Sequence, residues 1–447
     1  MGVRSPYGVP LNSFDPSMVP GGSSSGSAVA VAAGLVSFAL GTDTAGSGRV
    51  PAGFNNIVGL KPTKGWLSTG GLVPACRSLD CISILAFSVP DALTVLDVAE
   101  GYDPDDPYSR HAGLSPASGL RLGIPDAPNF FGDHAAAAAF GAACARAEVL
   151  GAILVGFDFT PFAHAANLLY GPWAAERTAA VGHMLDQPAA LHSVIRTILE
   201  GGCAVSGAAL FQTQHDLAAL RRQTEAVWQG MDMLLLPTTP TAFSLAQVAA
   251  EPIRLNAQLG TYTNFVNLMD LAAIAIPGGF HASGFPHGVT LVGPAWSDRA
   301  LAAFGARMHR AAALPMGATG ATLPHDDVEI AVFGAHMEGQ PLNADVVSRG
   351  GWFVRACRTA PSYRMLALPG RLRRPALVRG GDASLAGEIW ALPQSAIAAF
   401  LGTIAPPLGL GTVGLDRGPA LGFIAEASAE GLDITAYGSW RAWLTTQ

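Results

Sequence analysis

Lysine is nearly absent from this chain of 447 residues. Of its 26 lysine and arginine residues only Lys61 and Lys64 are lysine, and the formal net charge is −7. This acidic balance argues against a general nucleic-acid binder, because that function needs a positively charged face. Half of the residues are apolar and only 13% are charged, a composition that excludes a disordered chain.

Cysteines and long apolar runs are also scarce. The five cysteines are scattered without CxxC spacing, which excludes a common zinc motif and a disulfide framework and indicates a reducing compartment. The longest apolar run, residues 28–40, is interrupted by Gly34 and Ser37 and is shorter than the roughly 20 residues of a spanning helix. The first residues show no signal-peptide pattern. We therefore expect a cytoplasmic protein with no membrane segment.

The apolar residues follow an alternation of short runs and helical spacing, which indicates an α/β layer fold. Residues 36–42 predict a buried strand, because the run is apolar and follows a stretch of small residues. Further strands are predicted at 57–61, 120–124, 152–156, 233–236, 273–277 and 286–293, and helices at 88–101, 134–151, 297–311 and over much of 162–230.

The composition changes near residue 312, where small residues, glycine, proline and threonine replace the periodic pattern. We predict a first domain over 1–311, a linker over 312–327 and a compact α+β module over 328–447. In this module we expect strands at 328–333, 363–367, 386–391 and 421–425, and one helix at 394–401.

Two glycine-serine segments, 20–27 and 41–49, carry the candidate chemistry. A phosphate-binding P-loop would end in GK[ST], and neither segment contains lysine. Residues 22–26 satisfy G-x-S-x-G, but a nucleophile elbow needs a preceding strand, and the prolines of 10–20 exclude one. The remaining interpretation brings Ser23 and Ser47 together from two loops, where glycine-rich backbone directs N–H groups at an oxyanion.

The stretch from Gly21 to Thr63 resembles the amidase signature family, whose members hydrolyse amides with a Ser–cis-Ser–Lys triad. The resemblance implies that Ser47 is the nucleophile and that Ser23, on a cis peptide bond, is the bridging serine. It further implies an oxyanion hole from the backbone amides at Thr44, Ala45, Gly46 and Ser47. Asp43 and Arg49 flank this loop, and we interpret them as a structural ion pair.

The lysine of the triad lies upstream of the bridging serine in this family. The 22 residues before Ser23 contain no lysine, and Lys61 and Lys64 do not occupy the catalytic position of the motif. We therefore expect the chain as given to lack its general base and to be inactive. It either starts late or is an inactive relative, and its loop-like beginning favours a late start.

Further segments resemble the allophanate hydrolase family, in which an amidase domain precedes a smaller domain similar to gamma-glutamyl cyclotransferases. The resemblance implies an amidase signature fold, a mixed sheet core covered by helices, followed by a small α+β domain. The matching segments are TGGLVPACRSLDC (69–81), LLYGPWAAER (168–177), QLGTYTNFVNLMDL (258–271), VFGAHMEGQPLN (332–343), RTAPSYRMLALPG (358–370), GEIWALP (387–393), PPLGLGT (406–412) and ITAYGSWRAWL (434–444).

This family implies hydrolysis of allophanate (urea-1-carboxylate) to ammonia and carbon dioxide in urea degradation, with no metal or other cofactor. A carboxylate substrate suits an arginine fork and a tyrosine hydroxyl. By motif these are Arg177 and Tyr170, which are seven residues apart and would share one helix face. Tyr262, Asn264 and Asn267 are further candidates for the pocket, with core packing as the alternative for Tyr262. His336 and Glu388 are candidates in the C-terminal domain, with a purely structural role as the alternative for His336.

Two other functions stay open at this point. One is an amidase that acts on another small amide. The other is a non-catalytic pseudoenzyme that binds a partner such as urea carboxylase. The family resemblance is compatible with a homodimer and with a functional link to urea carboxylase, and it implies neither nucleic-acid nor membrane binding.

Overall fold

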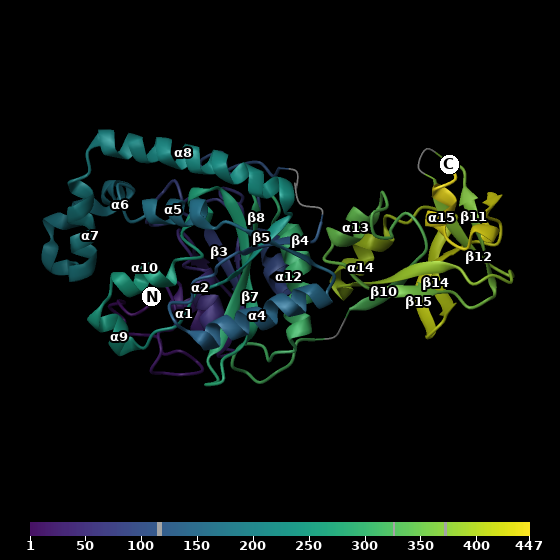
Figure 1. Ribbon diagram of the computed structural model, residues 1–447, viewed down its shortest axis with the longest axis horizontal. Coiled ribbons are helices and arrows are strands. Elements are labelled where there is room, and N and C mark those ends of the chain that lie inside the picture. Colours follow the sequence, from purple (N-terminus) through teal and green to yellow (C-terminus); the bar gives the residue numbers. More distant parts are fainter. Residues whose placement is uncertain (114–118, 325–326, 371–372) are drawn as a thin grey trace. The chain divides into compact units, whose positions relative to one another are not determined.

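The computed structural model describes residues 1–113, 119–324, 327–370 and 373–447 (Figure 1). These residues form two compact units, Met1–Leu323 and Pro324–Gln447. Most of the predicted linker over 312–327 belongs to the first unit, because the Gly317 N–H donates to Asn56 and the Ala318 N–H donates to Ala32. Residues 325–326 of that linker lie outside the described residues.

An eight-stranded mixed sheet forms the centre of the first unit, which confirms the predicted fold class. Strand β4 pairs in parallel with β5 and β6, and the other neighbours are antiparallel. In order across the sheet the strands are β1 (Phe38–Thr42), β3 (Ile82–Ala86), β2 (Val58–Lys61), β7 (Leu271–Phe280), β8 (Pro286–Pro294), β6 (Met233–Pro237), β4 (Arg121–Pro125) and β5 (Ile153–Phe157).

Helices cover both faces of this sheet, so its central strands are apolar along most of their length (Figure 1). Ile274 and Ile276 of β7 join the core beneath α3 (Val89–Ala99), α4 (His134–Val149) and α12 (Asp298–Ala312). Leu271 and Ala273 join the core on the other face, which includes residues of α5 (Thr160–Leu168), α8 (Gly207–Gly230) and α11 (Phe265–Leu268). Alternate residues of one strand thus stabilise two helical layers.

Strand β1 corrects the prediction of a buried strand over residues 36–42. It is the edge strand of the sheet, and Phe38 and Leu40 are 47% and 50% exposed. An apolar run reports strand propensity, but it cannot show how many neighbours the strand will have. The sheet pairs β1 with β3 alone, which leaves the outer side of β1 uncovered.

The periodic region 162–230 forms several helices, because glycine and proline interrupt it. Gly171 and Pro172 separate α5 from α6, and Ser206 caps α8 by accepting a hydrogen bond from the Ala209 N–H. The helices and 3₁₀ turns here are α5 (Thr160–Leu168), α6 (Ala174–Val181), η1 (Gly182–Asp186), η2 (Pro188–Ala190), α7 (Ser193–Cys203) and α8 (Gly207–Gly230).

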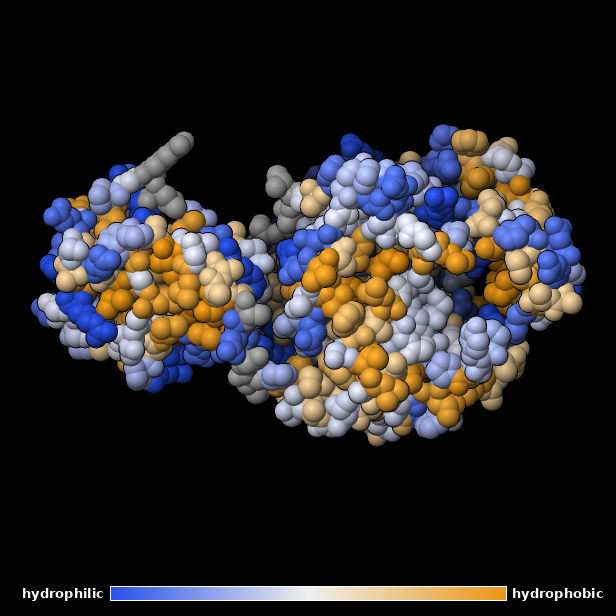
Figure 2. All heavy atoms as spheres, turned by 180° about the vertical axis from the view of Figure 1, so that it is seen from behind, coloured by the Kyte–Doolittle hydropathy of each residue, from blue (hydrophilic) through white to orange (hydrophobic). Residues whose placement is uncertain are grey.

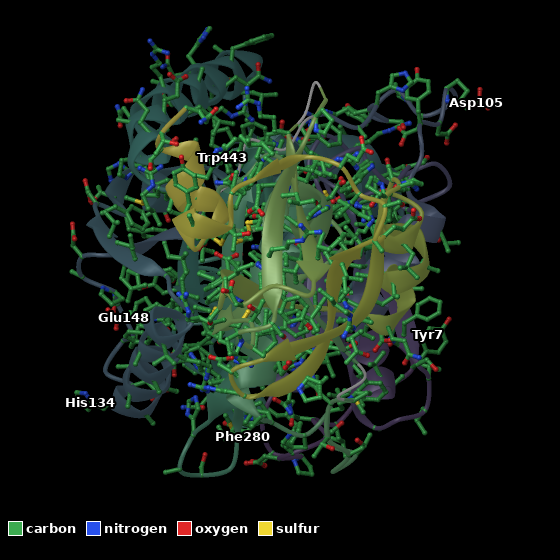
Figure 3. All side chains as sticks on the ribbon, turned by 90° about the vertical axis from the view of Figure 1, so that its right-hand side faces the viewer. Tyr7, Asp105, His134, Glu148, Phe280 and Trp443 are labelled. Atoms are coloured by element: carbon green, nitrogen blue, oxygen red, sulfur yellow. The ribbon has the colours of Figure 1, made fainter. Side chains whose placement is uncertain are left out.

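Shorter helices complete the first unit around the sheet: α1 (Ser25–Ala32), α2 (Arg49–Phe54), α9 (Leu245–Ala250), α10 (Arg254–Leu259) and α11 (Phe265–Leu268). Across the described ranges no individual helix is both long and apolar enough to cross a membrane. The pair α7 and α8 meets the length and composition criteria together, but it is bent by 96°. Polar and charged side chains such as His134 and Glu148 lie at the periphery of the unit (Figure 3).

The second unit has its own apolar core, which contains Trp390, Phe400, Trp440 and Trp443. Its predicted strands correspond to β9, β11, β13 and β15, and its predicted helix to α14. One sheet has the order β10 (Trp352–Arg358), β13 (Ala386–Leu392), β9 (Val328–Val332), β15 (Gly418–Ala425) and β14 (Leu408–Leu415); a second has β12 (Arg374–Arg379), β11 (Tyr363–Leu368) and β16 (Leu432–Asp433). The remaining elements are α13 (Asn343–Val347), α14 (Gln394–Leu401), η3 (Thr435–Tyr437) and α15 (Trp440–Leu444).

Two buried histidines predict acid sensitivity of the first unit. Burial lowers the pKa of His287 to about 3 and that of His309 to about 4. An unfolded histidine titrates near 6.5, so the unfolded chain binds more protons below that pH and the free energy of unfolding falls as pH falls. We expect His309→Leu to make the decrease between pH 6 and pH 5 shallower by about 1 kcal/mol per pH unit in urea denaturation.

The matched control is His134→Leu, because His134 is exposed at the start of α4 (Figure 3). Its pH dependence should follow that of the unchanged protein. Equal slopes for His309→Leu and the unchanged protein would contradict the assignment of this acid sensitivity to His309.

Candidate active site

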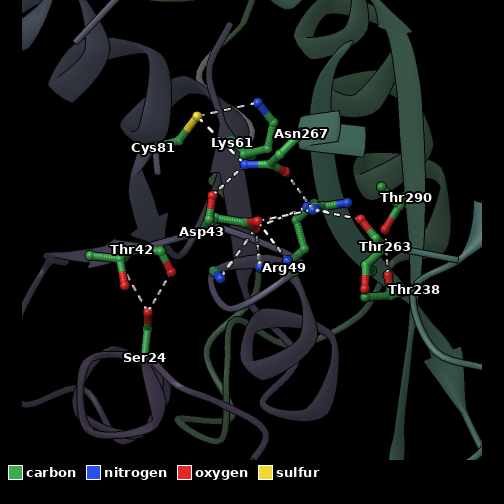
Figure 4. A network of polar contacts seen from close by, with 12 residues as sticks. Ser24, Thr42, Asp43, Arg49, Lys61, Cys81, Thr238, Thr263, Asn267 and Thr290 are labelled. Carbon is green, nitrogen blue, oxygen red and sulfur yellow. Dashed lines mark hydrogen bonds and ion pairs between the residues drawn. The ribbon is translucent and has the colours of Figure 1, made fainter. Parts of the chain in front are cut away.

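The two serine segments lie side by side in the first unit. The Ser24 N–H donates to the Ser47 carbonyl oxygen at 3.2 Å, and the Ser24 hydroxyl donates to the Thr42 carbonyl oxygen and accepts from the Thr42 N–H, each at 3.1 Å (Figure 4). The peptide bond between Gly22 and Ser23 is cis. Ser23 and Ser47 line one cavity of about 400 Å³. The pairing of the two loops therefore brings the two predicted catalytic serines to one site.

A buried ion pair determines the shape of the Ser47 loop. Asp43 and Arg49 have fully buried side chains, with Nε and Oδ2 2.9 Å apart and Nη2 and Oδ1 2.9 Å apart (Figure 4). Burial opposes the charged form of Asp43, but Arg49, and after it Lys61 and a backbone N–H, outweigh burial and hold the pKa of this carboxyl below its usual range. The interpretation of Asp43 and Arg49 as a structural pair agrees with this geometry.

One part of the predicted oxyanion hole is wrong. The Gly46 N–H donates to Asp43 Oδ1 at 2.7 Å, so it is not available to a substrate oxygen. Within the described part of the chain the N–H groups of Thr44, Ala45 and Ser47 have no acceptor, and these residues line the cavity. Glycine is needed at position 46 for two other reasons. Its φ of 119° is positive, and a Cβ at this position would lie only 2.4 Å from Thr263 Oγ1.

Neither lysine of the chain lines this cavity. Lys61 is buried, and its Nζ donates to the Pro62 carbonyl oxygen at 2.7 Å and to Cys81 Sγ at 3.5 Å (Figure 4). Lys64 Nζ donates to the Ser78 carbonyl oxygen at 2.9 Å. Both ammonium groups thus donate to acceptors that do not line the cavity.

Tyr170 and Arg177 line the same cavity but do not share a helix, which corrects the predicted arrangement. Tyr170 follows the end of α5, whereas Arg177 lies on α6, because Gly171 and Pro172 break the helix between them. The Tyr170 hydroxyl accepts from Asn256 Nδ2 at 3.1 Å. The side chain as a whole is 48% exposed, but desolvation of its hydroxyl raises the pKa of this phenol, so it is neutral at pH 7 and available as a donor.

Glu176, which the sequence analysis did not select, holds α6 against the loop before β3. Its carboxylate accepts from the Ser78 N–H at 2.6 Å, the Ser78 hydroxyl at 2.7 Å and Trp173 Nε1 at 2.9 Å. Asp80, two residues after Ser78, accepts hydrogen bonds from the Ala75 N–H and from the Thr44 hydroxyl. This set of hydrogen bonds connects the helix of Arg177 with the Ser47 loop. The adjacency of Glu176 to Arg177 was the only sequence signal for it.

Tyr262, a candidate for the pocket, takes the alternative core position instead. It is 1% exposed, its hydroxyl accepts from the Asn129 N–H at 2.6 Å, and burial raises its pKa to about 12. Its ring packs against Phe159 in the core. Asn264, by contrast, lines the cavity as predicted. The two residues have different surroundings although only Thr263 separates them in the chain.

Comparison with known proteins identifies the family. The family model described as amidase matches residues 1–302, and the model described as allophanate hydrolase C-terminal domain matches residues 328–445. The chain belongs to the amidase family. Its second unit matches the C-terminal domain of the allophanate hydrolases, and both matches agree with the resemblance seen in the sequence.

The relatives of this amidase include longer proteins. It is 37% identical to the urea amidolyase of Saccharomyces cerevisiae over 99% of this chain and 26% of that protein, so it spans about a quarter of that relative. It is 35% identical to the solved allophanate hydrolase of Kluyveromyces lactis, with a TM-score of 0.72, covering 100% of this chain and 79% of that one. The urea amidolyase structure from K. lactis is 34% identical, with a TM-score of 0.72, over 100% of this chain and 29% of that one.

In the C-terminal unit of this amidase, His336 and Glu388 lie in separate environments. Glu388 is buried and accepts from Trp390 Nε1 at 2.9 Å and the Glu338 N–H at 2.8 Å, and it pairs with Arg441 at 2.7 Å. His336 lines a small cavity of about 30 Å³ and stacks on Phe423. Burial lowers the pKa of His336 to about 4, so the imidazole is neutral at pH 7.

Glu388 does not line the cavity of His336. The structure therefore does not join these two candidates into one site. Across the described residues of both units, no cluster of three or more histidine, cysteine, aspartate or glutamate side chains is arranged to hold a metal ion.

Proposed function

We propose that this amidase hydrolyses urea-1-carboxylate by acyl transfer to Ser47. The observation that carries this proposal is that one cavity joins Ser47 to the guanidinium of Arg177, and no carboxylate of the described residues pairs with that guanidinium. An arginine without a carboxylate partner in a cavity favours a substrate carboxylate, because planar carboxylates accept two hydrogen bonds from this group. The similarity to allophanate hydrolase and to urea amidolyases supports the same substrate.

The reaction begins when Ser47 Oγ attacks the terminal carbonyl carbon of the substrate. The N–H groups of Thr44, Ala45 and Ser47 stabilise the oxyanion that forms, and the bridging hydroxyl of Ser23 passes the serine proton toward the general base. Ammonia leaves with a proton, and an acyl-enzyme remains on Ser47. Water then releases N-carboxycarbamate, which loses carbon dioxide, so no redox partner or cofactor takes part in the balance.

The general base is the part of this mechanism that the chain as given does not supply. A serine hydroxyl is a weak nucleophile without a neighbouring base, and no lysine lines the cavity of Ser47. We therefore propose that the chain as given turns over its substrate very slowly. The affinity of the cavity for the substrate carboxylate should be unchanged, because Tyr170 and Arg177 do not depend on that lysine for their position.

Urea-1-carboxylate must be supplied by a reaction that carboxylates urea. We propose a functional link of this kind with a urea carboxylase, in a cytoplasmic pathway of urea degradation. The match to urea amidolyases over 99% of this chain supports that link. Co-purification of a urea-carboxylating activity with the tagged chain from its own cells would test it.

Substrate selectivity tests the proposed role of Arg177. With a lysine-bearing form of the protein, we expect Arg177→Met to lower kcat/KM for urea-1-carboxylate about 10- to 100-fold, because a charged hydrogen bond contributes about 1.5–3 kcal/mol. The kcat/KM for propionamide, which has no carboxylate, should change less than threefold. Ammonia release measures both reactions.

The control is Arg196→Met, because Arg196 pairs with Glu200 on the exposed side of α7. It should leave both substrates unaffected. An equal loss on urea-1-carboxylate and propionamide in Arg177→Met would show that Arg177 supports the fold and not carboxylate recognition, and it would favour an amidase with another substrate.

A further inference from the structure

A second cavity adjoins the site of Ser47. It has a volume of about 510 Å³ and lies between α6, α7 and the segment before α10. The two cavities share Tyr170 and Arg177 as a common wall, and Arg4, Leu169, Ile198 and Asn256 also border both. The proposed substrate is small and has no hydrocarbon group, so the first cavity alone accommodates it.

The walls of the second cavity are mainly apolar away from Arg177. Val194 and Ile198 come from α7, Val205 follows that helix, and Pro252 and Ile253 precede α10. Ile253 is 54% exposed, so the cavity is open to solvent on that side. Figure 2 shows the surface hollowed beside this helical region, with apolar side chains at its edge.

Two arginine residues border both this apolar cavity and the first one. Arg177 and Arg4 line both cavities, and no carboxylate of the described residues forms an ion pair with either. Burial lowers the pKa of Arg4, because it disfavours the charged form. An anion between these two groups would offset that cost. An apolar chamber that two arginines border matches an amphipathic anion.

We propose that this chamber is a second binding site, which takes the hydrocarbon part of a monocarboxylate whose head group contacts Arg177 and Arg4. Aliphatic carboxylates with four to eight carbons fit this chemistry. Such a ligand uses the guanidinium that the proposed substrate needs, so it competes with dicarboxylates and with substrate. Binding does not require turnover, and the proposal therefore holds or fails independently of the catalytic assignment.

Calorimetric titration of the full chain tests the chamber. Hexanoate should bind at least 30-fold more tightly than acetate, because each buried methylene adds favourable transfer free energy. Malonate, which has the size of the proposed substrate, should displace hexanoate by competing for Arg177. Equal binding of acetate and hexanoate would overturn the proposal, and so would a hexanoate affinity that saturating malonate leaves unchanged.

A filling variant tests the location of the site. Gly201 lines the chamber from α7, and a Cβ at this position meets no atom within 4 Å. Gly201→Leu should weaken hexanoate binding at least tenfold and leave malonate binding unchanged. The matched control is Gly141→Leu in α4, where a Cβ also meets no atom within 4 Å. Unchanged hexanoate binding in Gly201→Leu, with native circular dichroism, would place the hexanoate elsewhere and overturn the proposal.

Discussion

Joining the lysine-bearing segment of an active amidase signature enzyme ahead of Met1 is expected to raise turnover of urea-1-carboxylate at least 10³-fold over the chain as given. The reason is that the cavity of Ser23 and Ser47 contains no lysine, and loss of one member of a catalytic triad costs about 10⁴- to 10⁶-fold in kcat. Ammonia release under saturating substrate measures the gain.

Two variants of the joined protein serve as controls. Replacing the introduced lysine with methionine should return turnover to that of the chain as given, and Ser47→Ala should do the same because the nucleophile is lost. If the chain as given already turns over urea-1-carboxylate as fast as the joined protein, the proposed need for this base is wrong. If the joined protein folds, binds malonate and remains inactive, the pseudoenzyme alternative is favoured.

The second large effect concerns the buried pair behind the Ser47 loop. Arg49→Met is expected to lower the free energy of unfolding of the first unit by about 3–5 kcal/mol, because it leaves the Asp43 carboxylate buried without its partner. The variant also removes the hydrogen bond from Arg49 Nη2 to the Thr263 carbonyl oxygen at 3.2 Å. Urea denaturation at pH 7 gives the difference.

The exposed pair of Arg196 and Glu200 provides the comparison for this experiment. Arg196→Met should change the free energy of unfolding by less than about 1 kcal/mol, because solvent screens exposed charges. The double variant Asp43→Asn with Arg49→Met should be less destabilised than the sum of the two single variants, since no unpaired charge remains. A loss below 1 kcal/mol in Arg49→Met would contradict the stabilising role of this pair.

Local patterns predicted much of the fold. The helix predicted over 134–151 is α4 (His134–Val149), because alanines and a terminal glycine act within the segment itself. The edge position of β1 (Phe38–Thr42) was not predictable, and β3 (Ile82–Ala86), which pairs with it, was not predicted at all. Strand order depends on contacts between distant segments, and an apolar run does not record which segment it will meet.

The candidate site divides in the same way. The glycine-serine segments indicated the family and the candidate pair Ser23 and Ser47, and the composition of the chain showed how little lysine it contains. Only the tertiary structure decided that the Gly46 N–H donates to Asp43 and that Tyr262 lies in the core. It also decided that Tyr170 and Arg177 reach the cavity from two separate elements and not from one helix. A motif specifies which chemical groups are present. Their direction and their partners depend on how separate elements pack, because each buried polar group takes whichever acceptor or donor the folded chain brings within reach.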